Sequence, residues 1–170
     1  MKNVGAVSRG CNEVSTGIPA DTLIIGEGSF PLYWSSTYTK SILAIYDVAV
    51  DGAAIQKSIL KDKVPINFDS ITKSLPPGDY YWNITDEEGN GCERSFLRLL
   101  DSATYEQNVY MLIENIPNTT MAEIAFARSF ILQQHFYIAP ALASSKLAAE
   151  LEPSNKLYKK NLAQFYATQF

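Results

Sequence analysis

The chain has 170 residues, of which 46% are hydrophobic and 19% are charged, and its formal net charge is -4 at pH 7. This length and hydrophobic content suffice for a folded core, which excludes a disordered chain. The 18 acidic and 14 basic residues form no long runs, so a nucleic-acid partner, which needs a basic surface, is not expected. No apolar stretch approaches the roughly 18 residues of a membrane-spanning helix, so no membrane span is expected.

Residues 1–20 are interpreted as an N-terminal lead segment whose apolar stretch is too short for a signal peptide. Taken literally, this favours a cytoplasmic chain; a fragment of an exported protein would favour the periplasm or the cell surface. Cys11 and Cys92 lie far apart, without a CxxC pattern or accompanying histidines, which argues against a zinc site and a redox site. Two cysteines do not define a disulfide scaffold, so buried free thiols are expected ahead of a disulfide, which stays the alternative.

Residues 21–101 read as short strands separated by turns. The strand-like runs are residues 22–26, 30–34, 41–50, 54–60, 64–68, 80–85 and 92–100. Two prolines at residues 76 and 77 are expected to stop strand pairing there, because proline lacks a backbone donor. Seven short runs with regular turn signals predict an antiparallel β-sandwich of two sheets.

Aromatic residues are the enriched class in this region. Trp34, Tyr46, Tyr80 and Trp82 are expected in the core. Tyr33, Tyr38 and Tyr81 are expected on or near the opposite faces, where tyrosines can stack on sugar rings or anchor a protein interface. The alternative is that these tyrosines pack beneath the helical segment. It is favoured because the apolar faces of the helices must pack against another part of the protein.

From residue 102 to residue 170 the hydrophobic period becomes helical, and three to four helices are expected. Asp101 or Ser102 caps a helix that runs through Ile116, and Asn118-Thr119-Thr120 caps a second one. A third covers residues 141–152 with Pro140 in its first turn, and a fourth follows Pro153. The last helix carries an aromatic stripe, formed by Tyr158, Leu162, Phe165 and Tyr166, which must pack against something.

Two stretches of the strand region carry a family resemblance. Phe30-Pro31-Leu32-Tyr33-Trp34 and Leu75-Pro76-Pro77-Gly78-Asp79-Tyr80-Tyr81-Trp82-Asn83-Ile84 resemble immunoglobulin-like and fibronectin type III-like modules of bacterial envelope proteins. In those modules an early tryptophan packs in the core, and a corner of leucine, proline, glycine and tyrosine leads into a late strand. The resemblance implies a spacer or a binding surface and carries over no catalytic residue.

The stretch 139–169 is similar to tetratricopeptide repeats. The second helix of a repeat and its terminating proline match at Ala141, Ala148, Leu151 and Pro153, and residues 156–166 match the opening helix of a next repeat. The first helix departs from the pattern: where the family has Trp, Leu, Gly and Tyr, this chain has Ala125, Arg128, Ser129 and Leu132. Repeat arrays need about three units, so these helices are expected to lean on the sandwich, on a partner or on further sequence.

No group of reactive side chains stands out, so no catalytic residue, metal ligand or cofactor is predicted. The sole histidine, His135, has no partner nearby in the sequence. The carboxylates have structural explanations in turns, caps or solvated helix faces: Glu87, Glu88, Asp101, Glu150 and Glu152. A hydrolase that uses a carboxylate pair remains the least favoured alternative.

The sequence thus predicts an α+β chain in which residues 21–101 form an antiparallel immunoglobulin-like β-sandwich and residues 102–170 a tetratricopeptide-like helical segment. The expected function is that of a non-enzymatic protein-interaction or spacer module within a larger bacterial envelope-associated protein. The alternative is a carbohydrate-binding module that uses exposed tyrosines. The candidate interaction residues are Tyr33, Tyr38, Tyr81, Tyr158, Phe165 and Tyr166.

Overall fold

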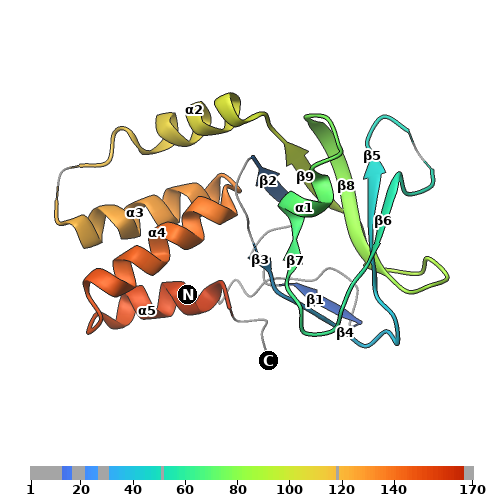
Figure 1. Ribbon diagram of the computed structural model, residues 1–170. Helices are drawn as coiled ribbons and strands as arrows, with labels where there is room; N and C mark the ends of the chain where they lie inside the picture. The colour runs from blue at the N-terminus through green and yellow to red at the C-terminus, as the bar shows by residue number, and fades with distance from the viewer. Residues whose placement is uncertain (1–12, 17–21, 27–30, 51, 118, 167–170) are drawn as a thin grey trace.

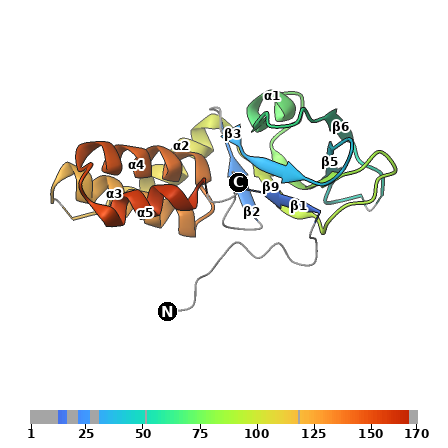
Figure 2. The same ribbon diagram turned by 90° about the horizontal axis from the view of Figure 1, so that it is seen from below.

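The computed structural model describes residues 13–16, 22–26, 31–50, 52–117 and 119–166. In this part of the chain nine strands form three sheets and five helices are present, so the fold is a mixed α+β fold. Figures 1 and 2 show the four C-terminal helices gathered on one side of the strands. None of the helices in the described ranges is both long and apolar enough to cross a membrane.

The largest sheet has the strand order β2-β9-β8-β5-β6. Its strands are β2 (Thr22–Ile25), β9 (Ser95–Leu99), β8 (Gly78–Thr85), β5 (Ile42–Asp47) and β6 (Gln56–Ile59). β2 runs parallel to β9, whereas the other three pairings are antiparallel. The expectation of a wholly antiparallel arrangement is therefore wrong. A parallel pair needs a long connection, and nearly the whole strand region lies between β2 and β9.

Two small sheets complete the strand region. β1 (Val14–Thr16) pairs with β4 (Trp34–Ser36), and β3 (Pro31–Leu32) pairs with β7 (Ile66–Asn67), both antiparallel. Val14, Leu32 and Ile66 belong to the same core cluster as residues of the large sheet. β1 lies within residues 1–20, which were predicted to form a lead segment. Its three residues are too few to show an alternating pattern, so the sequence did not reveal this strand.

The inner face of the large sheet forms the core of the strand region. Tyr80 and Trp82 are buried there, as the alternation of β8 predicts, and Trp34 is half-buried and packs against the same core cluster. Tyr46 is also buried, but the prediction that it shares their face is wrong, because it pairs directly with Tyr81. The buried residues of β5 on the core side are Leu43 and Ile45.

Several strand boundaries differ from the prediction. The run 64–68 is mostly not a strand: Phe68 begins the short helix α1 (Phe68–Thr72), which Asn67 caps by accepting a hydrogen bond from the Ser70 amide. Phe68 is fully buried. Its ring meets the Trp82 ring edge-on, with the ring centroids 5.2 Å apart. Strand pairing stops at the two prolines, as predicted. It resumes directly after them, because β8 begins at Gly78.

The four long helices are α2 (Ser102–Ile113), α3 (Met121–Gln134), α4 (Ile138–Leu151) and α5 (Lys156–Gln164). Asp101 caps α2 and Thr120 caps α3 in a capping box with Glu123, which confirms the predicted starts of these helices. α2 ends three residues before Ile116, and α4 begins three residues before residue 141. Pro140 lies in the first turn of α4, where a backbone donor has no partner within the helix.

The helices pack against the β2 edge of the large sheet. The Ile24 amide of β2 donates a hydrogen bond to the Phe136 carbonyl at 3.2 Å. Tyr105 of α2 packs directly on Gly26, where a Cβ atom would collide with the tyrosine ring. The Tyr105 ring also lies 5.3 Å from that of Tyr137, so α2, the α3–α4 connection and the sheet share one core.

A buried polar contact joins the last three helices. The Asn161 side chain of α5 donates hydrogen bonds to Ser129 Oγ of α3 at 3.0 Å and to Ser145 Oγ of α4 at 2.9 Å. Both serines are fully buried, and nothing else polar is needed to satisfy the amide nitrogen. We call Asn161, Ser129 and Ser145 the polar node.

Cys92 forms a disulfide bond, so the expectation of free thiols is wrong for this residue. The chain has one other cysteine, Cys11, which lies outside the described residues. Spacing in the sequence could not decide the matter, because pairing depends on which loops the fold brings together.

Candidate functional site

The face of the five-stranded sheet that points away from the core carries a row of three aromatic side chains. Tyr46 of β5 stands directly opposite Tyr81 of β8, and Tyr81 stands opposite Phe96 of β9. Directly opposed residues share one face of a sheet, while the alternate residues Trp82 and Leu97 fill the core on the other face. We call Tyr46, Tyr81 and Phe96 the aromatic row.

The aromatic row is an uneven surface and not a flat platform. The ring centroids of Tyr81 and Phe96 are 6.0 Å apart and the ring planes meet at 73°, which is an edge-to-face contact. Tyr81 and Phe96 are half-buried, whereas Tyr46 retains only 8% of its surface. A partner would therefore meet the two rings of β8 and β9 before that of Tyr46.

Two exposed arginines border the row. The Arg94 guanidinium lies 3.6 Å from the centre of the Tyr46 ring, which accounts for the burial of that ring by a cation–π contact. Arg98 of β9 lies 5.5 Å from the Phe96 ring centre. It also donates two hydrogen bonds to the Asp79 carboxylate, at 2.6 and 2.9 Å. The aromatic surface is thus bordered by two arginines, and the charge of Arg98 is balanced by Asp79.

Most polar groups at the row already have partners. The hydrogen bonds from Arg98 hold the pKa of Asp79 below its ordinary value, so this carboxylate stays ionised and is a poor proton donor at neutral pH. Tyr46 donates its hydroxyl hydrogen to Asn83 Oδ1 at 3.1 Å, and Asn83 Nδ2 donates to the Cys92 carbonyl at 2.9 Å. The arrangement is suited to recognition by surface contact.

Among the tyrosines singled out from the sequence, Tyr81 lies in the aromatic row and Tyr33 does not. Tyr33 meets Tyr166 edge-on, with ring centroids 5.9 Å apart, so it packs against the end of the helical segment. For Tyr33 this contact is of the kind that the favoured alternative expects, in which the tyrosine packs against the helical segment. Tyr38 is half-buried against the strand core, and burial raises the pKa of its hydroxyl.

Tyr158 and Phe165, two of the predicted interaction residues, are buried, so the stripe of α5 packs against the rest of the protein and these two residues are not available to a partner. Their side chains retain 5% and 4% of their surface. Tyr158 packs against Phe126 of α3, with ring centroids 4.9 Å apart, and Phe165 belongs to the main core. An apolar stripe must be covered, and here α3, α4 and the strand region cover it. Tyr166 is half-buried beside Tyr33.

Neither a protein-family model nor a curated protein matches the chain. The family resemblances drawn from the sequence therefore stay predictions. The functional argument rests on the side chains and distances described above.

Four residues of this surface had not been expected in the site. Phe96 and Arg98 alternate with buried Leu97 and Leu99, which is the pattern of a strand with one solvated face. That pattern was the available signal for an outward phenylalanine. Tyr46 and Arg94 gave no such signal, because their place depends on the register of β5 with β8 and on the loop before β9.

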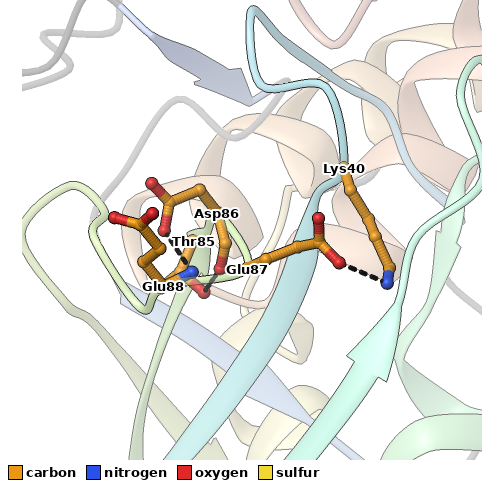
Figure 3. A network of polar contacts seen from close by, with 5 residues as sticks. All are labelled: Lys40, Thr85, Asp86, Glu87 and Glu88. Atoms are coloured by element: carbon orange, nitrogen blue, oxygen red, sulfur yellow. Dashed lines mark hydrogen bonds and ion pairs between the residues drawn. The ribbon is translucent and has the colours of Figure 1, made fainter.

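The acidic turn after β8 is a structural feature. The Asp86 carboxylate accepts hydrogen bonds from the Glu88 amide at 2.9 Å and the Asn90 amide at 2.8 Å, and those from Asn90 help to hold its pKa below the ordinary value. Glu87 forms an ion pair with Lys40 at 2.6 Å (Figure 3). These carboxylates shape the turn and anchor it to the loop before β5, as the structural explanation predicts.

Proposed function

We propose that the chain is a non-enzymatic protein-interaction module built from an immunoglobulin-like β-sandwich and a tetratricopeptide-like helical segment. The observation that carries the proposal is the aromatic row with its two arginines on the outer face of the large sheet. Tyrosine, phenylalanine and arginine are among the residue types enriched at protein interfaces, because all three supply a large contact area and tyrosine and arginine add directional polar groups.

The strand arrangement supports the immunoglobulin-like part of this proposal. Variable-type immunoglobulin domains place strands G, F, C and C′ side by side, and the order β9-β8-β5-β6 corresponds to it. The Tyr80 hydroxyl donates a hydrogen bond to the Pro76 carbonyl at 2.8 Å. A tyrosine at the start of a late strand that bonds back to the preceding turn is typical of the tyrosine corner of these domains.

The helix arrangement supports the tetratricopeptide-like part. α3 and α4 form an antiparallel hairpin, and α5 packs on both through the polar node. α3 and α5 begin about one 34-residue repeat apart. In this proposal the sandwich presents the aromatic row and the helices form a rigid support against its β2 edge.

The carbohydrate-binding alternative has less support. Sugar rings stack on aromatic faces, and two adjacent rings serve together when they are nearly coplanar. The ring planes of Tyr81 and Phe96 meet at 73°, and the Tyr33 ring already packs against the ring of Tyr166. A protein surface adapts to such an uneven patch more readily than a chain of sugar rings does.

The disulfide at Cys92 supports an extracytoplasmic place for this module, because disulfides persist in oxidising compartments. Thiol counting on the purified chain, denatured without reductant, tests this point. We expect no free thiol before reduction and two after it. Two free thiols before reduction in protein from its native source would contradict it.

The functional test begins with capture of a partner from extracts of the source cells on the immobilised chain, followed by purification of that partner. Its dissociation constant is then measured by calorimetry for the wild type, Tyr81→Ala and Phe96→Ala. Loss of an interface aromatic costs about 2 kcal/mol or more, so we expect at least about tenfold weaker binding for each variant. Tyr110→Ala is the matched control, because Tyr110 is an exposed tyrosine on α2.

Equal weakening by the control and by the two row variants would refute the role of the aromatic row, provided that circular dichroism shows all three to be folded. Binding to a glycan array that is lost with Tyr81→Ala would favour the carbohydrate alternative instead.

A further inference from the structure

Among the described residues, no strand pairs with the outer side of β6, which leaves this edge of the large sheet open on the side away from the helices (Figures 1 and 2). Leu60 donates its amide hydrogen to the Ser41 carbonyl at 2.9 Å, and Ile59 stands opposite Ile42. In an antiparallel ladder, bonded and non-bonded pairs alternate. The N–H and C=O groups of Lys57 and Ile59 therefore point away from β5, toward the open edge.

Exposed apolar side chains border both ends of β6. They are Val48, Val50, Ile55, Ile59 and Val64, and each is at least 40% exposed. They make up five of the thirteen large hydrophobic residues that are exposed in the described part of the chain, although they come from one short stretch. An open strand edge with apolar neighbours is a surface that pairs with another strand.

The charges at this edge select the kind of strand. Lys57, Lys61 and Lys63 are exposed, and Asp62 is the one acidic residue between Gln56 and Val64. The edge is therefore positive, although the chain as a whole carries a net charge of -4. A second copy of the chain would add the three lysines of its own β6 edge to this positive surface, which like-charge repulsion disfavours. Lysine on an edge strand is a known device against self-pairing.

We propose that the β6 edge binds an extended segment of a partner protein, which adds a sixth strand to the sheet and carries acidic and apolar side chains. The backbone of that segment bonds to Lys57 and Ile59. These two side chains lie on one face of β6, so the segment carries an acidic residue opposite Lys57 and an apolar residue two positions away, opposite Ile59. Lys57 and Ile59 point to the same face of the sheet as the aromatic row, but the row lies on β5, β8 and β9 and not at the β6 edge, so this inference goes beyond the proposed function.

The test uses a fluorescent synthetic peptide that alternates glutamate and valine on one face and threonine on the other. Its affinity for the full chain is measured by fluorescence anisotropy. A peptide with lysine in place of glutamate tests the charge, and we expect it to bind at least about tenfold more weakly, a difference of about 1.4 kcal/mol. A peptide N-methylated at alternate residues tests the backbone pairing, and we expect no binding.

Variants of the chain locate the binding to the edge. Ile59→Pro removes one outward N–H and leaves the pairing with β5 intact, since proline is tolerated on an edge strand, and Ile59→Val is its matched control. We expect at least about tenfold weaker binding for the proline variant and little change for the valine variant. Lys57→Glu should reverse the preference between the acidic and the basic peptide, and Phe96→Ala should leave it unchanged.

Hydrogen exchange on the wild type gives a readout that does not depend on any variant folding. The amides of Lys57 and Ile59 should exchange more slowly when the acidic peptide is bound. Failure of the acidic peptide to bind, unchanged exchange at these amides, or equal binding by folded Ile59→Pro would each overturn the proposal. So would a wild-type dimer in sedimentation that Ile59→Pro abolishes, since the occupant would then be a second copy.

Discussion

Replacement of Asn161 by alanine tests how the three C-terminal helices are held together. The Asn161 amide bonds to Ser129 of α3 and Ser145 of α4, at 3.0 and 2.9 Å, from a side chain that is 8% exposed. Both hydroxyl groups are fully buried. A single side chain therefore joins one helix to two others inside the protein.

The expected magnitude follows from these contacts. Each buried hydrogen bond contributes about 0.5–1.5 kcal/mol net. The serine hydroxyls retain a partner, because each can bond to the carbonyl one turn earlier in its own helix. Asn161→Ala should therefore lower the free energy of unfolding by about 2 kcal/mol, the sum of two average bonds. Removal of both serine hydroxyls together with Asn161→Leu should cost less, because replacing both partners of a buried hydrogen bond by apolar groups of similar shape can be nearly neutral.

The assay is urea denaturation followed by far-ultraviolet circular dichroism. A double-mutant cycle of Asn161→Ala with Ser129→Ala should give a coupling energy of about 1 kcal/mol. Asn115→Ala is the matched control: Asn115 is exposed, so its change should stay within about 0.5 kcal/mol. A loss below about 0.5 kcal/mol for Asn161→Ala, or a coupling energy near zero, would show that the polar node does not hold the helices together.

Four further predictions concern the strand region and its contact with the helices. Gly26→Ala should lower stability by about 1–3 kcal/mol in thermal denaturation, because the new methyl group collides with the Tyr105 ring; an unchanged midpoint would contradict this contact. Burial raises the pKa of Tyr105 to about 12, above its value in the unfolded chain, so this residue should destabilise the fold as pH rises through about 10. Tyr105→Phe should flatten that part of the stability–pH curve. Arg98→Gln should raise the pKa of Asp79 in an NMR titration, because the arginine hydrogen bonds lower it; their contribution to stability is present above about pH 4 and is lost as pH falls through the lowered value. Tyr80→Phe should cost about 1 kcal/mol in urea denaturation, since it removes a hydrogen bond to the preceding turn, and equal midpoints would argue against that bond.

Local signals predicted the helix starts well. Asp101 and Thr120 cap helices through hydrogen bonds within a few residues, so the sequence contains both partners of each contact. Asn155, two residues after Pro153, caps α5 in the same way. The end of α2 was less predictable, because no glycine or left-handed residue marks it before Pro117.

The candidate site was predictable only in part. Alternation along β8 placed Tyr81 on the face opposite Trp82, which the structure confirms. The alternation of β5 did not reveal which of its faces meets the main core, because both faces of that strand are apolar and both are buried. Tyr46 was therefore assigned to the wrong side, and its place beside Tyr81 came only from the register of the two strands.

The aromatic stripe of α5 was also predictable only in part. The spacing of Tyr158 and Phe165 established an apolar helix face that needs a cover. That spacing does not show whether the apolar face is exposed for a partner protein or is buried within the fold of the chain itself. The polar node and the contact with Phe126 turn the stripe inward, and both depend on residues more than one helix away.

By itself, the sequence determined the features that arise from neighbouring residues: the change of hydrophobic period near Asp101, the caps of α2 and α3, and the reversal at the two prolines. The tertiary structure alone decided the parallel pairing of β2 with β9, the aromatic row, the open β6 edge and the burial of the α5 stripe. The physical reason is the range of the interactions. Capping and periodicity act within one or two turns of chain, whereas strand register and helix docking are set by contacts between segments distant in sequence.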